Sequence, residues 1–239
     1  MNRTKRLIIS ILIVVLIGLG AIIAGVIFLG ETSILATGDK HILVCAIDES
    51  EPRAGMGACD MAFIVSLNNG TLKDYTAFYP GGMRHPTAAE PEEYQKQGAG
   101  AKLLMHDAFY DADNSKGLQY AKEIVESNKG IKIDNVVAVN SEGLDAVLAA
   151  AGPLEVNGQQ TNASAIDIIR EEDWNQGVSR GEAVLDIVKA AANKAKNPDT
   201  KTAMINAAMN QFTKGNIIID NGGDFAGLLA SKGIETFFH

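Results

Sequence analysis

An uninterrupted apolar run near the start of the chain places the strongest constraint on this protein. Residues 7–30, LIISILIVVLIGLGAIIAGVIFLG, carry no charge and have Ser10 as their one polar side chain. The apolar core of a cleaved signal peptide is about 7 to 15 residues long, whereas about 20 residues are needed to cross a bilayer. The run therefore predicts a transmembrane helix that stays attached to the rest of the chain.

The charges on either side of this run indicate its orientation. Three basic residues precede it: Arg3, Lys5 and Arg6. The next charged residue is Glu31. Because the basic flank of a membrane helix stays in the cytoplasm, residues 1–6 are predicted to be a cytoplasmic tail. Residues 31–40 would then be a linker, and residues 41–239 an extracytoplasmic domain anchored to the cell membrane.

The part of the chain beyond the membrane run is acidic. The whole chain has 21 basic and 29 acidic residues. Since three of the basic residues precede the run, the remainder has a net charge of about −11. Proteins that bind a polyanion usually present a basic face. Nucleic acid is therefore not expected as a partner, and any anion site must be local.

Two cysteines, Cys45 and Cys59, lie on segments that we expect to be neighbouring strands. A disulfide between them would suit an exported domain, but two buried thiols are an equally good interpretation for a reducing habitat. The sequence leaves both alternatives open.

Strand-like and helix-like patterns alternate along the rest of the chain. Apolar runs predict strands at 41–47 and 60–67, and the turn signal NNG leads the second run into 71–79 as a hairpin. Helices are expected at 115–128, 141–153, about 180–196, about 199–214 and 224–233, and further strand-like segments at 133–139, 165–171, 216–220 and 234–238. This order predicts one α/β domain with a central mixed sheet flanked by helices.

Arginine is scarce beyond the membrane run, and its positions are informative. Four arginines stand in loops or at the ends of elements: Arg53, Arg84, Arg170 and Arg180. A guanidinium grips phosphate or carboxylate oxygens through two hydrogen bonds and stays charged when buried. With Asp48 and Asp60 at strand ends, these arginines could hold a magnesium-bound diphosphate. The alternative is that each pairs with an acid on the acidic surface.

Several segments around these residues resemble, in the same order, the LytR-CpsA-Psr (LCP) family. ILVCAID ends at Asp48, and CDMAFIVSL opens the next strand with Asp60. Three later segments also fit the family pattern: KLLMHDAFY, AIDIIRE and SRGEAVL. LCP proteins are membrane-anchored bacterial enzymes that move glycopolymers from a polyprenyl-diphosphate carrier onto the cell wall. The resemblance covers about residues 41–190 and implies an LCP-like fold with that kind of transferase activity.

The resemblance also implies roles for individual residues. Asp48 and Asp60 would hold Mg²⁺, and arginines would neutralise the diphosphate. Arg170 and Arg180 fall on matched arginine positions. Arg53 lies three residues beyond a family arginine that this sequence lacks, and so does Arg84, so that both could reach back as substitutes. Departures from the family pattern leave open whether the domain is catalytic.

The segment YPGGMRHP at 79–86 contains one of these departures. Where the family has Pro-Arg-Asp, this chain has Pro80 followed by Gly81 and Gly82. Glycines expose backbone N–H groups, which can bind phosphate oxygens. We therefore expect a loop in which Gly81, Gly82 and Arg84 bind the ligand.

His106, followed by Asp107, is a candidate general base for the incoming sugar hydroxyl. The alternative is a helix cap or a satisfied polar residue. A transition-metal site formed by His85, His106 and the aspartates is a further alternative. The implied catalytic residues are thus Asp60, His106, Arg170 and Arg180.

The domain as a whole looks still more similar to an uncharacterised family of membrane-anchored proteins in methanogenic archaea, which supplies no known activity. Two classes of function follow from the sequence. The first is a magnesium-dependent glycopolymer transferase acting on a polyprenyl-diphosphate-linked glycan. The second is a non-catalytic surface protein that binds a wall polymer, a lipid diphosphate or a partner in a degenerate site. A scaffold that makes no use of the site is a third alternative.

Overall fold

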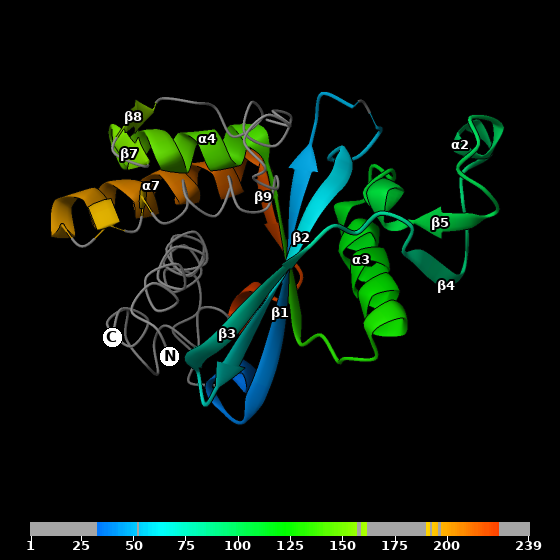
Figure 1. Cartoon of the computed structure of the whole chain (residues 1–239), viewed down its shortest axis with the longest axis horizontal. Coiled ribbons are helices and arrows are strands. Elements are labelled where there is room, and N and C mark those ends of the chain that lie inside the picture. Colours follow the sequence, from blue (N-terminus) through cyan, green and yellow to red (C-terminus); the bar gives the residue numbers. More distant parts are fainter. Residues whose placement is uncertain are drawn as a thin grey trace.

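A computed structural model describes residues 33–51, 53–156, 159–161, 190–191, 193–195 and 197–224. Its centre is a five-stranded mixed sheet in the order β3-β2-β1-β6-β9 (Figure 1). These strands span Asp39–Asp48 (β1), Ala58–Asn68 (β2), Thr71–Phe78 (β3), Asn135–Asn140 (β6) and Ile217–Ile219 (β9). Strands β1 and β6 are parallel, and the other neighbours are antiparallel. The predicted mixed sheet is confirmed.

The hairpin between β2 and β3 forms where the turn signal predicts it. Asn69 has φ 49° and Gly70 has φ 75°. Two consecutive residues with positive φ are the requirement of the tight turn that matches the twist of antiparallel strands. The hairpin continues the antiparallel pairing of β1 with β2, so three strands that follow one another in the chain lie side by side.

Helices lie on both sides of this sheet (Figure 1). On one side is α3 (Asn114–Lys129), together with the short 3-10 helix η2 (Met105–Asp107). On the other are α4 (Ser141–Ala150) and α7 (Pro198–Lys214). Gly143 lets α4 approach β9, since a Cβ on this residue would lie 2.8 Å from the carbonyl oxygen of Asn216. The flanking helices agree with the sequence prediction.

Alternate strand residues fill the core on the α3 side. From the sheet, Leu43, Cys45 and Ile47 join Val136 and Ala138, and all five are completely buried. From α3, the contributing residues are Leu118, Ala121, Ile124 and Val125. Burial of this apolar surface is the main force that holds the helix to the sheet. Cys45 and Cys59 are both in this core as free thiols, and burial raises the pKa of the Cys45 thiol.

An excursion between β3 and α3 stands at one end of the molecule. It consists of β4 (Arg84–Ala89), α2 (Glu92–Lys96) and β5 (Lys102–Leu104). Strands β4 and β5 pair with each other and form a separate two-stranded sheet. Pro86 is tolerated inside β4 because a strand with a single neighbour needs fewer backbone donors. The predicted loop at 79–86 therefore ends sooner, and its last three residues are strand.

The remaining short elements are η1 (Ile34–Ala36), β7 (Leu154–Val156) and β8 (Gln159–Thr161). Helix α7 begins slightly before the expected start near residue 199, because the side chain of Asn197 caps it by accepting from the backbone N–H groups of Asp199 and Thr200. Likewise Asp113 caps α3 by accepting from the backbone N–H of Ser115, so that this helix starts at Asn114. None of the helices in the described ranges is both long enough and apolar enough to cross a membrane.

Five expected elements fall wholly or mostly outside the described residues. They are the membrane run at 7–30, the segment at 165–171, the helix of about 180–196 and the elements after residue 224.

Candidate functional site

The candidate site lies at the edge of the sheet where β1 ends and β2 begins. Asp48 closes β1, and the loop after it leads through Glu51 and Arg53 to β2. The pairing of the two strands is irregular here: Ala46 faces Met61 and Ile47 faces Cys59, so the register passes over Asp60. Such a bulge bends a strand and re-aims a side chain. It leaves Asp60 within reach of His106 on η2.

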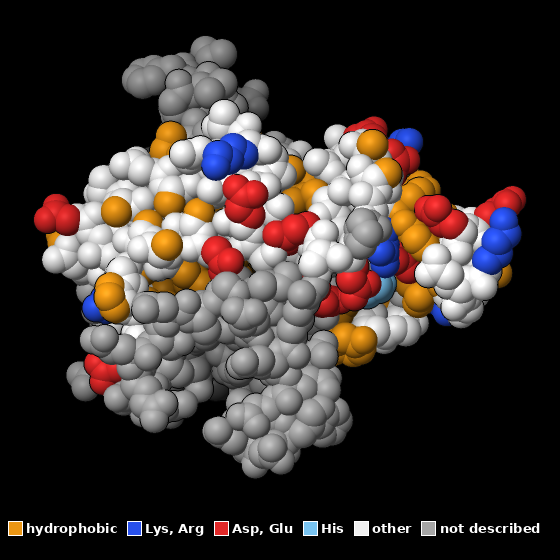
Figure 2. Space-filling view, turned by 90° about the horizontal axis from the view of Figure 1, so that it is seen from above, with side chains coloured by type: hydrophobic (Ala, Val, Ile, Leu, Met, Phe, Trp, Pro, Cys, Tyr) orange, Lys and Arg blue, Asp and Glu red, His pale blue; other side chains and the backbone are white. Residues whose placement is uncertain are grey.

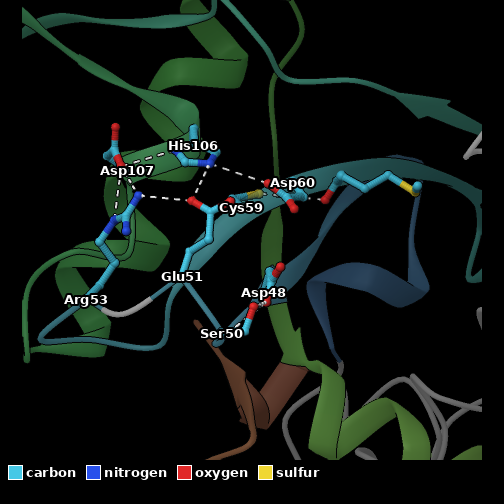
Figure 3. A network of polar contacts seen from close by, with 9 residues as sticks. Asp48, Ser50, Glu51, Arg53, Cys59, Asp60, His106 and Asp107 are labelled. Atoms are coloured by element: carbon cyan, nitrogen blue, oxygen red, sulfur yellow. Dashed lines mark hydrogen bonds and ion pairs between the residues drawn. The ribbon is translucent and has the colours of Figure 1, made fainter. Parts of the chain in front are cut away.

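Five side chains from this edge form what we call the carboxylate–histidine cluster: Glu51, Arg53, Asp60, His106 and Asp107 (Figure 3). The His106 Nε2 atom lies 3.3 Å from Glu51 Oε2 and 3.4 Å from Asp60 Oδ1. On the other side of the ring, Nδ1 lies 3.2 Å from Asp107 Oδ1. Both ring nitrogens therefore face carboxylates. Acidic, basic and histidine side chains also lie next to one another in the view of the molecule from above (Figure 2).

These carboxylates determine the charge of the histidine. Hydrogen bonds to Asp107 and Asp60 outweigh the opposing effect of burial and raise the pKa of His106 to about 10. Burial alone would raise the pKa of Asp107, but its hydrogen bonds to His106 and Arg53 prevail and lower that pKa. At neutral pH His106 is thus protonated in this state. In this state the imidazolium can act as a general acid, and it can act as a general base only after it has lost a proton.

Arg53 is largely occupied within the cluster. Its Nε and Nη2 atoms donate to Asp107 Oδ1 at 3.1 and 2.8 Å, and Nη2 lies 3.6 Å from Glu51 Oε2. The guanidinium also lies over the ring of Tyr94 in α2, 4.7 Å from the ring centroid. The interpretation that an arginine pairs with nearby acids is confirmed for this residue.

Asp48 is at the same edge as Asp60 (Figure 3) but is much more buried, with 2% of its surface exposed. Its Oδ1 accepts hydrogen bonds from the backbone N–H of Ser50 at 2.8 Å and from the Ser50 hydroxyl at 2.5 Å. The next residue, Glu49, accepts from the backbone N–H groups of Ser141 and Glu142 at 3.0 and 3.2 Å. The Glu49 carboxylate therefore accepts from the free backbone N–H groups in the first turn of α4. A negative charge is favourable at this end of a helix.

Arg84 has a different environment from the one the sequence led us to expect. It lies at the start of β4, and its guanidinium donates to the carbonyl oxygens of Lys102 and Ala99 at 2.7 and 2.6 Å. Gly100 makes room for it, because a Cβ there would lie 3.1 Å from the guanidinium nitrogens. In this state Arg84 ties the β4–β5 excursion together.

Gly81 and Gly82 form a tight turn. The Met83 N–H donates to the Pro80 carbonyl at 3.1 Å, and Gly82 has φ 80°, which only glycine adopts readily. At Gly81 a Cβ would meet the ring of Tyr79, so that this exposed side chain would have to move. The Met105 N–H donates to the Met83 carbonyl at 2.9 Å. This bond attaches the turn to the segment that carries His106.

Two expected site residues, Arg170 and Arg180, lie outside the described residues. The structure brings Asp60, His106 and Arg53 together, and it adds Glu51 and Asp107. Glu51 belongs to no recognised motif. The one sequence feature that could have pointed to it is its position three residues after Asp48 in the same loop. His85 is not part of this cluster: it is buried and bonds Glu123 on α3 at 2.7 Å.

Solved structures of known proteins share this fold at low sequence identity. TagV from B. subtilis is 16% identical with a TM-score of 0.53, covering 84% of this chain and 80% of its own. TagT, solved with LIIa-WTA, is 13% identical with a TM-score of 0.53, covering 88% and 81%. A protein called a transcriptional regulator, EF0465 from Enterococcus faecalis, is 16% identical with a TM-score of 0.54, covering 87% and 76%.

TagV and TagT are LCP proteins, so the LCP-like fold that the motifs implied is supported. At these identities the likeness concerns the fold alone. No curated protein matches the chain in sequence. The model of one protein family matches residues 37–174, and its description is protein of unknown function, DUF4012. The match includes every strand of the central sheet except β9, together with the whole carboxylate–histidine cluster. This chain therefore belongs to the DUF4012 family.

Proposed function

We propose that this protein is a membrane-anchored transferase that moves a glycopolymer from a polyprenyl-diphosphate carrier to an acceptor in the cell wall. The observation that carries the proposal is the meeting of Asp60, His106 and Glu51 at the end of β1 in an LCP-like fold. The TagT ligand LIIa-WTA supports a glycopolymer as the class of substrate. The anchor would be the predicted helix at 7–30, with the domain outside the membrane.

In this proposal Asp48 and Asp60 would hold a magnesium ion bound to the diphosphate. Asp48 and Asp60 lie at the same edge on adjacent strands, and carboxylate oxygens are what Mg²⁺ prefers. When bound, the ion would offset the charge of the diphosphate. Asp48 would have to share the oxygen that now accepts from Ser50.

The cluster can also balance the protons of the transfer. The acceptor's hydroxyl oxygen bonds to the phosphorus next to the glycan, and the bond to the polyprenyl phosphate breaks. His106, protonated at neutral pH, donates to the leaving phosphate. Glu51 or Asp60 accepts the hydroxyl proton and returns it through the ring of His106. By resemblance, Arg170 and Arg180 would neutralise the diphosphate, with the Gly81–Gly82 turn and Arg84 as further ligand contacts.

The test is calorimetric binding of a polyprenyl diphosphate to the full-length protein in detergent, with and without Mg²⁺. We expect magnesium-dependent binding that Asp60→Ala and Arg170→Ala each abolish. Glu92→Ala is the matched control, because this acid is on the surface of α2 and 90% of its side chain is exposed. Absence of binding to a folded protein would refute the proposal.

One observation favours a second candidate, a non-catalytic protein that binds a wall polymer or a lipid diphosphate. Arg53 is committed to Asp107 and Glu51, and a site whose guanidinium is already paired has less charge to offer a leaving group. This candidate predicts that ligand binds and that wild-type protein with Mg²⁺ and acceptor forms no product.

A further inference from the structure

Glu51, Asp60 and His106 are arranged so that they could bind a metal ion together, which is a role that the proposed reaction does not assign to them. Each residue offers one ligand atom, and the three atoms lie within 4.8 Å of one another. They come from a loop, a strand bulge and a 3-10 helix, so they converge from separate elements. We propose that these three side chains bind a divalent first-row transition metal such as Mn²⁺ or Zn²⁺.

The two distances from the histidine match those between neighbouring ligands of one metal ion. Metal–ligand bonds of about 2.1 Å with about 90 to 110° between them separate neighbouring ligand atoms by about 3.0 to 3.4 Å. The His106 Nε2 atom lies 3.3 Å from Glu51 Oε2 and 3.4 Å from Asp60 Oδ1. A cation can therefore replace the proton on Nε2 with small movements of side chains that are all at least partly exposed to solvent.

The surroundings of the histidine are those of a metal ligand. Histidines that bind metal usually donate their second ring N–H to a carboxylate, which fixes the ring and raises its basicity. Here Nδ1 lies 3.2 Å from Asp107 Oδ1. Asp107 is itself fixed by Arg53 at 2.8 Å and has 3% of its surface exposed. The ring is thus held in place on the side away from the site.

The charges also balance. The cluster holds three carboxylates and Arg53 (Figure 3), which leaves a net charge of about −2 when His106 is neutral. A divalent cation brings this sum to zero. Three protein ligands leave coordination positions for water or for an anionic substrate.

This site differs from the Asp48–Asp60 pair expected for Mg²⁺, although Asp60 belongs to both. Mg²⁺ favours oxygen ligands, whereas imidazole nitrogen favours transition metals. His106 therefore determines which cation binds here. The inference concerns metal binding alone and stands whether or not the protein transfers a glycopolymer. A cation on Nε2 takes the place of the proton that His106 would donate in that reaction, so one state of the site excludes the other.

Calorimetry of the tag-free, full-length protein in detergent, titrated with Mn²⁺ and with Zn²⁺, tests the inference. We expect one site that loses at least about 100-fold in affinity in His106→Asn, because removing even the group that orients a metal ligand costs about 10 to 100-fold. Asp107→Asn should cost about 10 to 100-fold on the same grounds. His41→Asn is the control: His41 bonds Ser66 at the other end of β1, and its replacement should leave binding unchanged.

A spectroscopic measurement identifies the ligand directly. Electron spin-echo modulation from ¹⁴N should appear with Mn²⁺ bound to the wild type and disappear in His106→Asn. If that variant fails to fold, Glu51→Gln replaces it in the calorimetric titration, since 46% of the Glu51 side chain is exposed. Unchanged affinity in the folded ligand variants would overturn the inference. So would loss of Mn²⁺ binding in Asp48→Asn but not in His106→Asn, which would place the cation at the magnesium pair.

Discussion

His85 and His106 both face carboxylates, but the fold surrounds them differently. His85 is 3% exposed, and its Nδ1 accepts from the backbone N–H groups of Thr87 and Ala88 at 3.1 and 2.7 Å. Its Nε2 is therefore the donor to Glu123. His106 is 32% exposed in its side chain, and both of its nitrogens face carboxylates. Backbone bonds fix the first ring in one role, whereas the second can exchange a proton for a cation.

Replacing His85 should have the largest effect on stability. His85→Ala removes three hydrogen bonds and leaves a space between β4 and α3, so we expect a loss of about 2 to 3 kcal/mol in the free energy of unfolding. Urea denaturation of the full-length protein in detergent measures it, with His41→Ala as the control. A loss below about 1 kcal/mol would show that the buried His85 ring contributes little to the stability of the fold.

Arg53→Met should have the next largest effect. It keeps the length of the side chain but leaves Asp107 with His106 as its remaining cation among the cluster residues. Because Asp107 is buried and its partner charge is lost, we expect about 1 to 2 kcal/mol of destabilisation at neutral pH. Arg53→Lys should recover part of it. Urea midpoints equal to that of the wild type would mean that the ion pairs of the cluster contribute nothing.

The dependence of stability on pH should report on His106. The pKa of His106 is about 10 in the folded protein, above its value near 6.5 in an unfolded chain. A raised pKa stabilises the fold fully below the unfolded value, and the contribution disappears as pH rises through the folded value. Stability of the chelator-treated protein should therefore fall between about pH 6.5 and 10. His106→Gln should flatten this segment, and an unchanged slope in the variant would contradict the account.

The smallest effect is expected for an exposed ion pair. Lys96 lies 3.9 Å from Glu92 on α2, and both side chains are largely exposed. Solvent screens such pairs, so Lys96→Ala should change the free energy of unfolding by less than about 0.5 kcal/mol. A change in the free energy of unfolding as large as that of Arg53→Met would show that the partly buried ion pairs of the cluster contribute no more to stability than an exposed pair does.

Much of the fold could be predicted from local patterns. Apolar runs located β1 and β2, and the turn chemistry of Asn69 and Gly70 located the hairpin. Helix ends were less well predicted, because Asn197 and Asp113 compete with neighbouring polar residues as caps. Local patterns predict whether a helix or strand forms. The residue at which a helix begins is harder to predict when several neighbouring polar residues could cap it.

The site was predictable only in part. Asp60, His106 and Arg53 could be named, since each is a chemically distinctive residue beside a strand or helix end. The bulge that leaves Asp60 near His106 depends on pairing between strands, and the local sequence pattern did not predict it. For the same reason the sequence did not predict the partners of Arg84, since they are set by the pairing of β4 with β5.

The most direct test of the account is a crystal structure of the protein soaked with Mn²⁺ and measured at wavelengths above and below the manganese absorption edge. The account predicts an anomalous peak about 2.0 to 2.3 Å from His106 Nε2 and from carboxylate oxygens of Asp60 and Glu51. An anomalous map with no peak at the cluster, or with the peak beside Asp48 and away from His106, would contradict it.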